Sequence, residues 1–244
     1  MPADPLHDAE RHSRGGPFPP SPRREPAFNI PVVVLVFIAL CVGIHLARSY
    51  LLSPRQDFEV ILAGAFIPLR YSGEYLLDLP AFTSPLTYSL LHGGLAHLAV
   101  NMIWLAAFGS PLATRIGPVR FVLFWCATTL AAVALHYVLH MDSNVPLVGA
   151  SGAISGMMGA AARFGFRSSR GAGRAAFEGR MLTIPEALSS RTVVTFLAVW
   201  FVINLATGLA SGIPGVDGAI AWEAHVGGFL AGFLAVRLFD RRRA

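Results

Sequence analysis

Four polar side chains that could take part in hydrolysis lie within strongly apolar stretches of this chain. They are His97 and Asn101 in one stretch, Ser151 in a second and His225 in a third. A serine beside a histidine supplies the minimum parts of an activated nucleophile. Polar groups inside a membrane-spanning segment are costly to insert and are functional-site candidates by default. The pattern therefore predicts hydrolytic chemistry within a membrane.

The composition is that of a polytopic membrane protein. Of the 244 residues, 54% are hydrophobic and 14% are charged, whereas a soluble domain has about 25% charged residues. Cys41 and Cys126 lie in apolar stretches and lack the spacing of a disulfide framework or a metal site. The formal net charge of +5 comes from arginines at the ends of apolar stretches, so topology explains it better than nucleic-acid binding. We expect no nucleic-acid partner, metal or organic cofactor.

We predict an all-α fold, a bundle of six transmembrane helices in one membrane domain over residues 28–240. Residues 1–27 are rich in proline, arginine and acidic groups and are expected to form a disordered cytoplasmic tail; 241–244 would form a second, short one. Each apolar span is close to the ~20 residues that a helix needs to cross the hydrocarbon core. The spans lie at about 31–52, 87–109, 119–140, 147–166, 192–210 and 219–239, and a long first loop covers 53–86.

The arginines predict the orientation of this bundle. Arginine-rich segments precede the first span and follow the second, fourth and sixth, so six spans place them all on one side. Because positive residues are retained in the cytoplasm, both termini are expected there. An odd number of spans would remove this agreement. Every basic residue is arginine, and alanine and glycine are abundant, which suggests a GC-rich bacterial genome and a bacterial inner membrane.

The second span holds three of the polar candidates. His97 and Asn101 are four residues apart and share one helix face, and His92 lies five residues before His97, nearer the outer end. Histidine and asparagine also join membrane helices by hydrogen bonds. Taken alone, the pair fits that structural role as well as it fits a reaction.

Ser151 begins the helix of the fourth span, whose small residues allow close helix packing. Packing is a sufficient explanation for these small residues, which are Gly149, Gly152, Gly156 and Gly159 with Ala153 and Ala160. A helix start offers free backbone N–H groups and positive dipole character, which would stabilise an oxyanion beside Ser151. A lone serine in a membrane helix is more often bonded to its own backbone.

The sixth span, like the fourth, carries small residues, and they lie beside His225. Small residues close to the face of His225 are Ala221, Ala224, Gly228, Gly232 and Ala235. This span can therefore press against the fourth span. His225 and Ser151 both lie near the outer ends of their helices, so their depths in the membrane can match. The matching depth predicts a serine–histidine dyad.

Together these residues resemble the rhomboid family of intramembrane serine proteases, over residues 31–239. The family pattern His-x4-His-x3-Asn is met by His92, His97 and Asn101. The pattern Gly-x-Ser-Gly is met by residues 149–152, and Ala-His-x-x-Gly-x-x-x-Gly by residues 224–232. Residues 115–121 also resemble a feature that follows the second helix in the family.

The resemblance implies cleavage of peptide bonds in or beside the transmembrane helices of other membrane proteins, within the lipid bilayer. Ser151 would be the nucleophile and His225 the general base and later the acid, in a dyad without a third carboxylate. The side chains of Asn101 and His97, with the backbone N–H of Ser151, would stabilise the oxyanion. Supporting roles would fall to His92, Gly149, Gly152 and Gly228. Water would enter through a cavity open to the outer side. The oligomeric state is left open.

The chain departs from the family pattern at two places. Residues 83–85 are Thr-Ser-Pro where many members carry Trp-Arg in the first loop, so loop packing and substrate access can differ. Ser155 stands where some members have an aromatic ring stacked on the histidine, so another group would have to orient His225. Asn204 and Trp200 in the fifth span are interpreted as core hydrogen bonding and packing rather than as part of a gate.

Two alternatives belong to other functional classes. One is a catalytically inactive rhomboid-like protein that binds or escorts membrane clients, although such relatives usually lack the serine or the histidine. The other is a small transporter that uses His97, Asn101 and His225 as an ion path, although the internal repeats typical of transporters are not evident.

Overall fold

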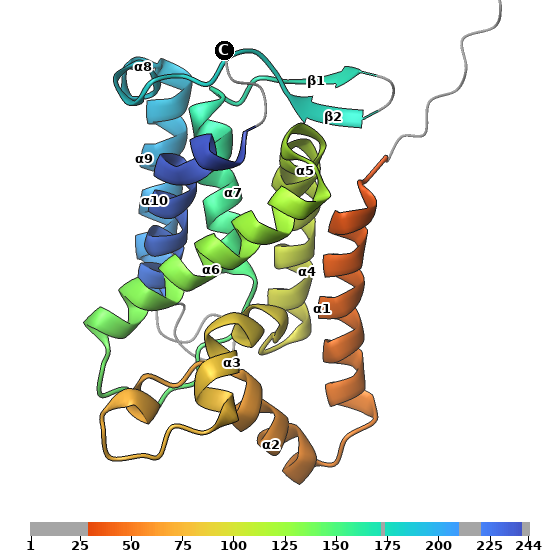
Figure 1. The fold of residues 1–244 in the computed structure, drawn as a ribbon, viewed down its shortest axis with the longest axis vertical. Coiled ribbons are helices and arrows are strands. Elements are labelled where there is room, and N and C mark those ends of the chain that lie inside the picture. Colours follow the sequence, from red (N-terminus) through yellow and green to blue (C-terminus); the bar gives the residue numbers. More distant parts are fainter. Residues whose placement is uncertain (1–28, 172–173, 210–220, 241–244) are drawn as a thin grey trace, which may run out of the picture.

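The computed structural model describes residues 29–171, 174–209 and 221–240. The two predicted tails, 1–27 and 241–244, lie outside the described residues. Each predicted span overlaps a helical segment of one bundle (Figure 1). These segments are α1 (Val32–Tyr50), the continuous α4 (Leu95–Trp104), η3 (Leu105–Gly109) and α5 (Ser110–Ile116), then α6 (Pro118–Leu139), α7 (Ser151–Arg163), α9 (Arg191–Leu209) and α10 (Trp222–Phe239).

Four of the described helical segments are long and apolar enough to cross a membrane: α1, Leu95–Ile116, α6 and α9. In contrast, α7 has 13 residues, which at 1.5 Å per residue span only about 20 Å of a hydrocarbon core of about 30 Å. Its burial inside the bundle removes the need for a full-length apolar surface. The predicted number of six crossings therefore stays a prediction, while the helical membrane bundle is confirmed.

The second span begins and ends later than predicted. The prediction placed it at 87–109, but α4 starts at Leu95, after the 3₁₀ turn η2 (Tyr88–Leu90), and the helical segment runs on to Ile116. The Gly93-Gly94 pair interrupts the helix, because glycine carries a large conformational entropy cost in a helix. Gly117, at φ +83°, ends the segment, and Pro118 then starts α6.

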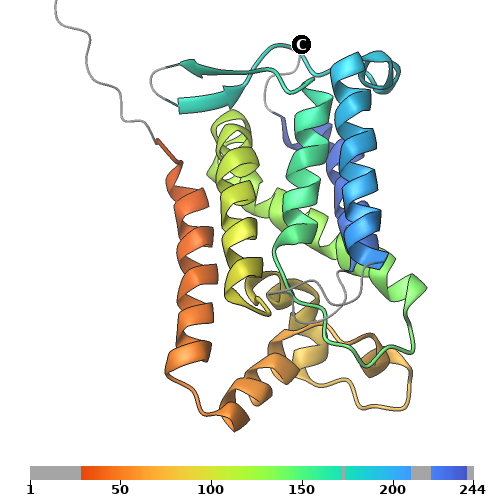
Figure 2. The same cartoon turned by 180° about the vertical axis from the view of Figure 1, so that it is seen from behind.

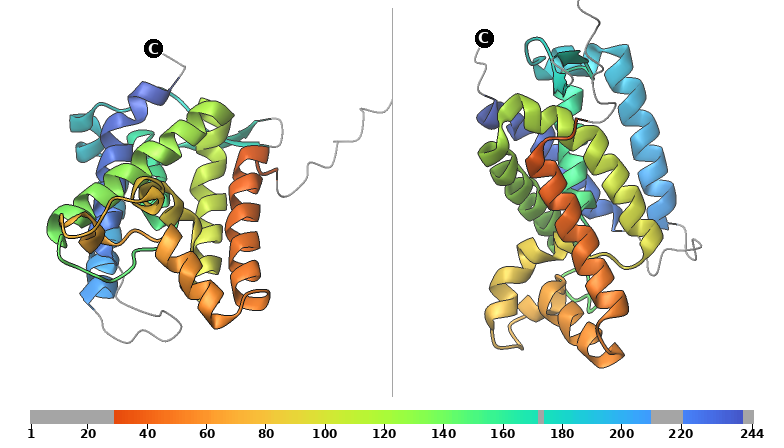
Figure 3. Two further views of the ribbon diagram at one scale, coloured as in Figure 1. Left: turned by 60° about the horizontal axis from the view of Figure 1, so that its bottom comes forward. Right: turned by 90° about the vertical axis from the view of Figure 1, so that its right-hand side faces the viewer.

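The first loop is folded rather than irregular. It contains α2 (Pro54–Gly64), η1 (Pro68–Tyr71) and α3 (Leu79–Thr87), which lie across one end of the bundle (Figure 3, left). Ser53 and Gln56 form a capping box that starts α2. Arg48 at the end of α1 bonds Asp57 of α2 at 2.7 Å and the backbone oxygen of His92 at 3.0 Å. The loop is thereby tied to the segment that leads into α4.

The opposite end of the bundle carries a small extension that the all-α prediction did not include. Strands β1 (Ser168–Gly171) and β2 (Arg174–Phe177) form an antiparallel hairpin, followed by α8 (Ile184–Ser189), near the end of α10 (Figure 2). Buried Arg115 makes two bonds to the Asp240 carboxylate, at 2.8 and 3.0 Å, and two to the carbonyls of Phe177 and Gly179. One arginine thus joins α5, the hairpin region and the end of α10.

Helix α7 forms the centre of the bundle and packs against α10 through glycines. Apart from Ser151, every residue of α7 is buried. A methyl group added at Gly159 would meet the backbone of Phe229 and Phe233, and one added at Gly232 would meet the backbone of Gly156. No side chain separates α7 and α10 at these positions, as the small residues predict. The close approach aligns the starts of the two helices.

Candidate active site

The segment before Ser151 is held in place by the first loop. Leu147 exchanges two backbone hydrogen bonds with Phe66, at 2.8 and 3.1 Å, and the N–H of Gly149 donates to the carbonyl of Tyr88 at 3.0 Å. Gly149 has φ +126°, a conformation that side-chain-bearing residues rarely adopt. Because of this backbone turn, Ser151 lies at the first position of α7. The first backbone N–H groups of a helix have no partner inside the helix.

Ser151 and His225 are in hydrogen-bond contact. The Nε2 atom of His225 lies 2.8 Å from the Oγ atom of Ser151. His225 is on the first turn of α10, and both side chains are half-buried at the same end of the bundle. The distance is that of a nucleophile and its base. Of the residues predicted for the site, these two therefore have the geometry expected of the predicted pair.

A third side chain completes a chain of hydrogen bonds. The Nδ1 atom of His225 lies 2.6 Å from the Oδ1 atom of Asn204 on α9. The Nδ2 atom of Asn204 donates to the carbonyl oxygen of Trp222 at 3.2 Å. From the sequence, Asn204 was expected to form hydrogen bonds in the core, with no connection to His225. A buried amide in an otherwise apolar span, together with the missing aromatic at Ser155, was the available signal.

His97 lies beside the turn that precedes Ser151. A methyl group added at Gly149 would be 2.8 Å from Nε2 of His97 and 3.6 Å from Oγ of Ser151, so the side chains of His97 and Ser151 flank the Cα of Gly149. Asn101 is buried one turn further along α4, and its Nδ2 donates to the backbone oxygen of His97 at 3.0 Å. The structure brings His97 to the pair and leaves Asn101 one turn away.

His92 is buried between the first loop and His97. Its ring meets the ring of His97 edge-on, with centroids 5.2 Å apart, and it is 1% exposed. Both ring nitrogens lack a hydrogen-bond partner among the described residues. Buried polar atoms of this kind are commonly satisfied by ordered water. His92 therefore supports His97 by packing.

A histidine–glutamate cluster near the site has the residue types of a metal centre. The donor atoms of His136, His140 and Glu223 lie within 4.8 Å of one another. His140 Nε2 lies 2.8 Å from the carboxylate of Glu223. This contact joins the end of α6 to α10.

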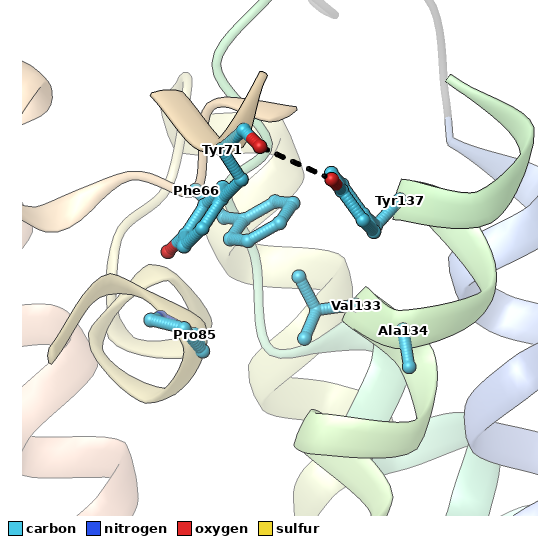
Figure 4. A pocket seen from close by; sticks show the side chains of 6 residues that line it. All are labelled: Phe66, Tyr71, Pro85, Val133, Ala134 and Tyr137. Atoms are coloured by element: carbon cyan, nitrogen blue, oxygen red, sulfur yellow. Dashed lines mark hydrogen bonds between the residues drawn. The ribbon is translucent and has the colours of Figure 1, made fainter. Parts of the chain in front are cut away.

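A cavity of about 250 Å³ lies between the first loop and α6. Its lining residues, shown in Figure 4, are Phe66, Tyr71, Pro85, Val133, Ala134 and Tyr137. The hydroxyl of Tyr137 donates to the backbone oxygen of Tyr71 at 3.4 Å, and the rings of Phe66 and Tyr71 stack. The lining is apolar and includes none of the candidate site residues. It is therefore not the water-filled cavity that the sequence analysis expects, which stays a prediction.

Comparison with known proteins identifies the family. Residues 81–242 match the family model of the Rhomboid domain. RHOMBOID-like protein 4 of Arabidopsis thaliana is 33% identical over 149 residues, which are 61% of this chain and 32% of the relative. Rhomboid protease GluP of Bacillus subtilis (strain 168) is 31% identical over 150 residues, 62% of this chain and 24% of the relative. RHOMBOID-like protein 5 of Arabidopsis thaliana is 31% identical over 144 residues, 59% of this chain and 39% of the relative.

The match thus covers only about a quarter to two fifths of the length of these curated relatives. The family model at residues 81–242 includes all of the candidate site residues. These residues are His92, His97, Asn101, Ser151, Asn204 and His225. Family membership and the apolar helices together make this an integral membrane protein. They support an activity of the intramembrane serine-protease kind.

Proposed function

The chain belongs to the rhomboid family, and we propose that it is an intramembrane serine endopeptidase that cleaves peptide bonds in or near the transmembrane segments of other membrane proteins. One observation carries the proposal: Nε2 of His225 lies 2.8 Å from Oγ of Ser151 at the start of α7. A hydroxyl so placed can be deprotonated as it attacks a carbonyl carbon.

The reaction proceeds in two halves. Ser151 Oγ attacks the substrate carbonyl while its proton passes to Nε2 of His225, and the resulting tetrahedral intermediate carries a negative oxygen. The imidazolium of His225 then protonates the leaving amine as the peptide C–N bond breaks, which leaves an acyl ester on Ser151. Water then gives a proton to Nε2 of His225 as it attacks the ester carbonyl, and His225 returns this proton to Oγ of Ser151 as the ester C–O bond breaks and the acid product leaves.

The oxyanion would be stabilised by donors at the start of α7 and on α4. The backbone N–H of Ser151 is the first donor, because a helix start has N–H groups without intrahelical partners. The ring of His97 lies beside Gly149 and can supply a second donor. Asn101 carries two amide hydrogens, and one of them is bonded to the carbonyl of His97. The other amide hydrogen is the donor that we propose for the oxyanion.

The proposed substrates are transmembrane helices that unwind near the outer face of the membrane in which the protein lies. A helix must open before its carbonyl can be attacked, because each carbonyl accepts a backbone bond from the next turn. Segments with glycine, proline or polar residues near the top of the helix should therefore be cleaved fastest. Comparing one cleaved substrate with its leucine-rich variant tests this preference, and equal cleavage rates would contradict it.

The proposed location is a bacterial inner membrane with both termini in the cytoplasm, as the arginine distribution suggests. The alternative is a catalytically inactive client-binding protein of the same family. The hydrogen-bonded pair of Ser151 and His225 favours the enzyme, because a client-binding surface does not need a serine aligned with a histidine.

Labelling with a fluorophosphonate separates these alternatives. The purified protein should be labelled at Ser151 and should cleave a model transmembrane substrate, while Ser151→Ala and His225→Ala should do neither. Ser155→Ala is the matched control, because Ser155 is a buried serine one turn further along α7 and should behave like the unaltered protein. Substantial turnover by folded Ser151→Ala would show that Ser151 is not the nucleophile.

A further inference from the structure

We infer that Asn204 is a positioning residue that fixes the tautomer and the ring orientation of His225. The inference rests on the proposed function, since it assigns a partner to the proposed base. It starts from the chain of hydrogen bonds that runs from the Trp222 carbonyl through Asn204 to His225 and Ser151, with lengths of 3.2, 2.6 and 2.8 Å. Asn204 is on α9, and the other three residues are on α7 and α10.

The orientation of the Asn204 amide follows from its two partners. The carbonyl oxygen of Trp222 can only accept a hydrogen bond, so the atom that faces it must be the NH₂ group of Asn204. The opposite orientation would place two acceptor oxygens against each other. The amide oxygen of Asn204 therefore faces His225.

The tautomer of His225 follows from the amide. The Oδ1 atom of Asn204 has no hydrogen, so Nδ1 of His225 must carry the proton that is shared between them. A neutral imidazole has one N–H, so Nε2 is left with a lone pair. This lone pair faces the hydroxyl of Ser151 at 2.8 Å, which is the arrangement that a general base requires.

The position of the ring also depends on Asn204. Among the described residues, no aromatic ring stacks on His225, and Ser155, four residues after Ser151, has too small a side chain to do so. Asn204 itself is 6% exposed, whereas most of α9 faces outward. An amide suits this buried place better than a carboxylate, because it satisfies the Nδ1–H group without the desolvation cost of a buried charge.

The face of α9 that carries Asn204 also contacts the side chain of Trp222 at the start of α10. Gly208 lies one turn after Asn204, and a methyl group added there would be 2.5 Å from the ring of Trp222. The Trp222 side chain thus packs on Gly208 while its carbonyl binds Asn204. These two contacts align α9 with the first turn of α10, where His225 lies.

The test compares Asn204→Leu with Asn204→Asp. Leucine has a similar size but cannot accept a hydrogen bond, so we expect kcat and the rate of Ser151 labelling by a fluorophosphonate to fall roughly 10²-fold, with KM little changed. Aspartate keeps an acceptor oxygen toward Nδ1 but places its second oxygen against the Trp222 carbonyl, so stability should fall while turnover per folded molecule stays within about 10-fold of the unaltered protein. A purely structural role would not produce rescue by aspartate.

Thr207→Val is the matched control on the same helix. Among the residues that the structure describes, the Thr207 hydroxyl bonds to the backbone of α9, at Ile203 and Asn204, so its loss should leave labelling unchanged. Thermal stability is measured on the same preparations. If Asn204→Leu labels at the normal rate per folded molecule, or if aspartate and leucine are equally impaired, the positioning role is wrong. If the unaltered protein is not labelled at all, the proposed function itself fails.

Discussion

Gly228 on α10 packs directly against the backbone of Gly152 on α7, with no side chain between them. Gly152 follows Ser151, and Gly228 lies one turn after His225, so this contact sits immediately beside the proposed catalytic pair. Ser151 and His225 are 74 positions apart in the sequence, but their side chains are in hydrogen-bond contact. We expect backbone contact between the two glycines to set that distance.

Gly228→Ala should therefore damage the site through packing alone. The added methyl group would overlap the carbonyl group of Gly152, so the two helices must separate. Overpacking of this kind typically costs about 1–3 kcal/mol of stability. We expect a lower melting temperature and a loss of fluorophosphonate labelling larger than the loss of folded protein.

Gly43→Ala is the control for this variant. A methyl group at Gly43 on α1 would meet nothing within 4 Å, and alanine is about 0.8–1.0 kcal/mol more favourable than glycine within a helix. Labelling should stay normal and stability should not fall. Normal labelling of folded Gly228→Ala would mean that the glycine contact does not set the serine–histidine distance.

Hydrophobic spans were predicted well where each helix is apolar along its whole length. The predicted limits of α1, α6 and α9 agree with the structure to within a few residues. The start of α4 was placed too early, because the predicted span ran through Gly93 and Gly94, which lie just before the helix begins at Leu95. Local hydropathy does not register such a break.

The contact between Ser151 and His225 could be expected from the sequence, whereas the contact between Asn204 and His225 could not. Ser151 and His225 lie together as the small residues beside them indicated. Asn204 was not connected to them, because its role depends on which helix packs beside α10. That pairing is a tertiary property, and the apolar pattern of α9 is similar on all sides. A polar residue in such a span indicates a hydrogen bond but does not identify the partner.

Residues at the two ends of the bundle should be reachable from opposite sides of the membrane. Asp142 lies in the exposed connection between α6 and α7, and Ser168 lies at the exposed start of β1. In a background with Cys41 and Cys126 replaced by alanine, a membrane-impermeant maleimide should label Asp142→Cys in intact bacteria. It should label Ser168→Cys only after the membrane is opened. The reverse pattern would contradict the proposed orientation.

The buried ion pair between Arg115 and Asp240 should support stability without affecting the chemistry. Their side chains are only 2% and 6% exposed. They lie where α5 ends, at the end of the bundle away from the start of α7 (Figure 1). Asp240→Asn leaves a buried guanidinium without its counter-charge, which should cost about 3 kcal/mol. Thermal denaturation should show this loss, while labelling per folded molecule stays normal. The control is Arg55→Gln, which breaks an exposed pair with Glu59 and should change neither measurement.

Asn101 and His97 test the proposed oxyanion site. Asn101→Ala removes a donor but leaves Ser151 and His225 in place, so peptide cleavage should slow by roughly 10²-fold or less. Ser151 should still be labelled, at a reduced rate.

His97→Ala should have a similar effect and also lower stability, because His97 packs against Gly149 and His92. Exposed Asn144 provides the matched control, and Asn144→Ala should leave cleavage unchanged. If these residues only join helices, the melting temperature will fall while turnover per folded molecule stays normal. That outcome would confine the chemistry to Ser151, His225 and the backbone at the start of α7.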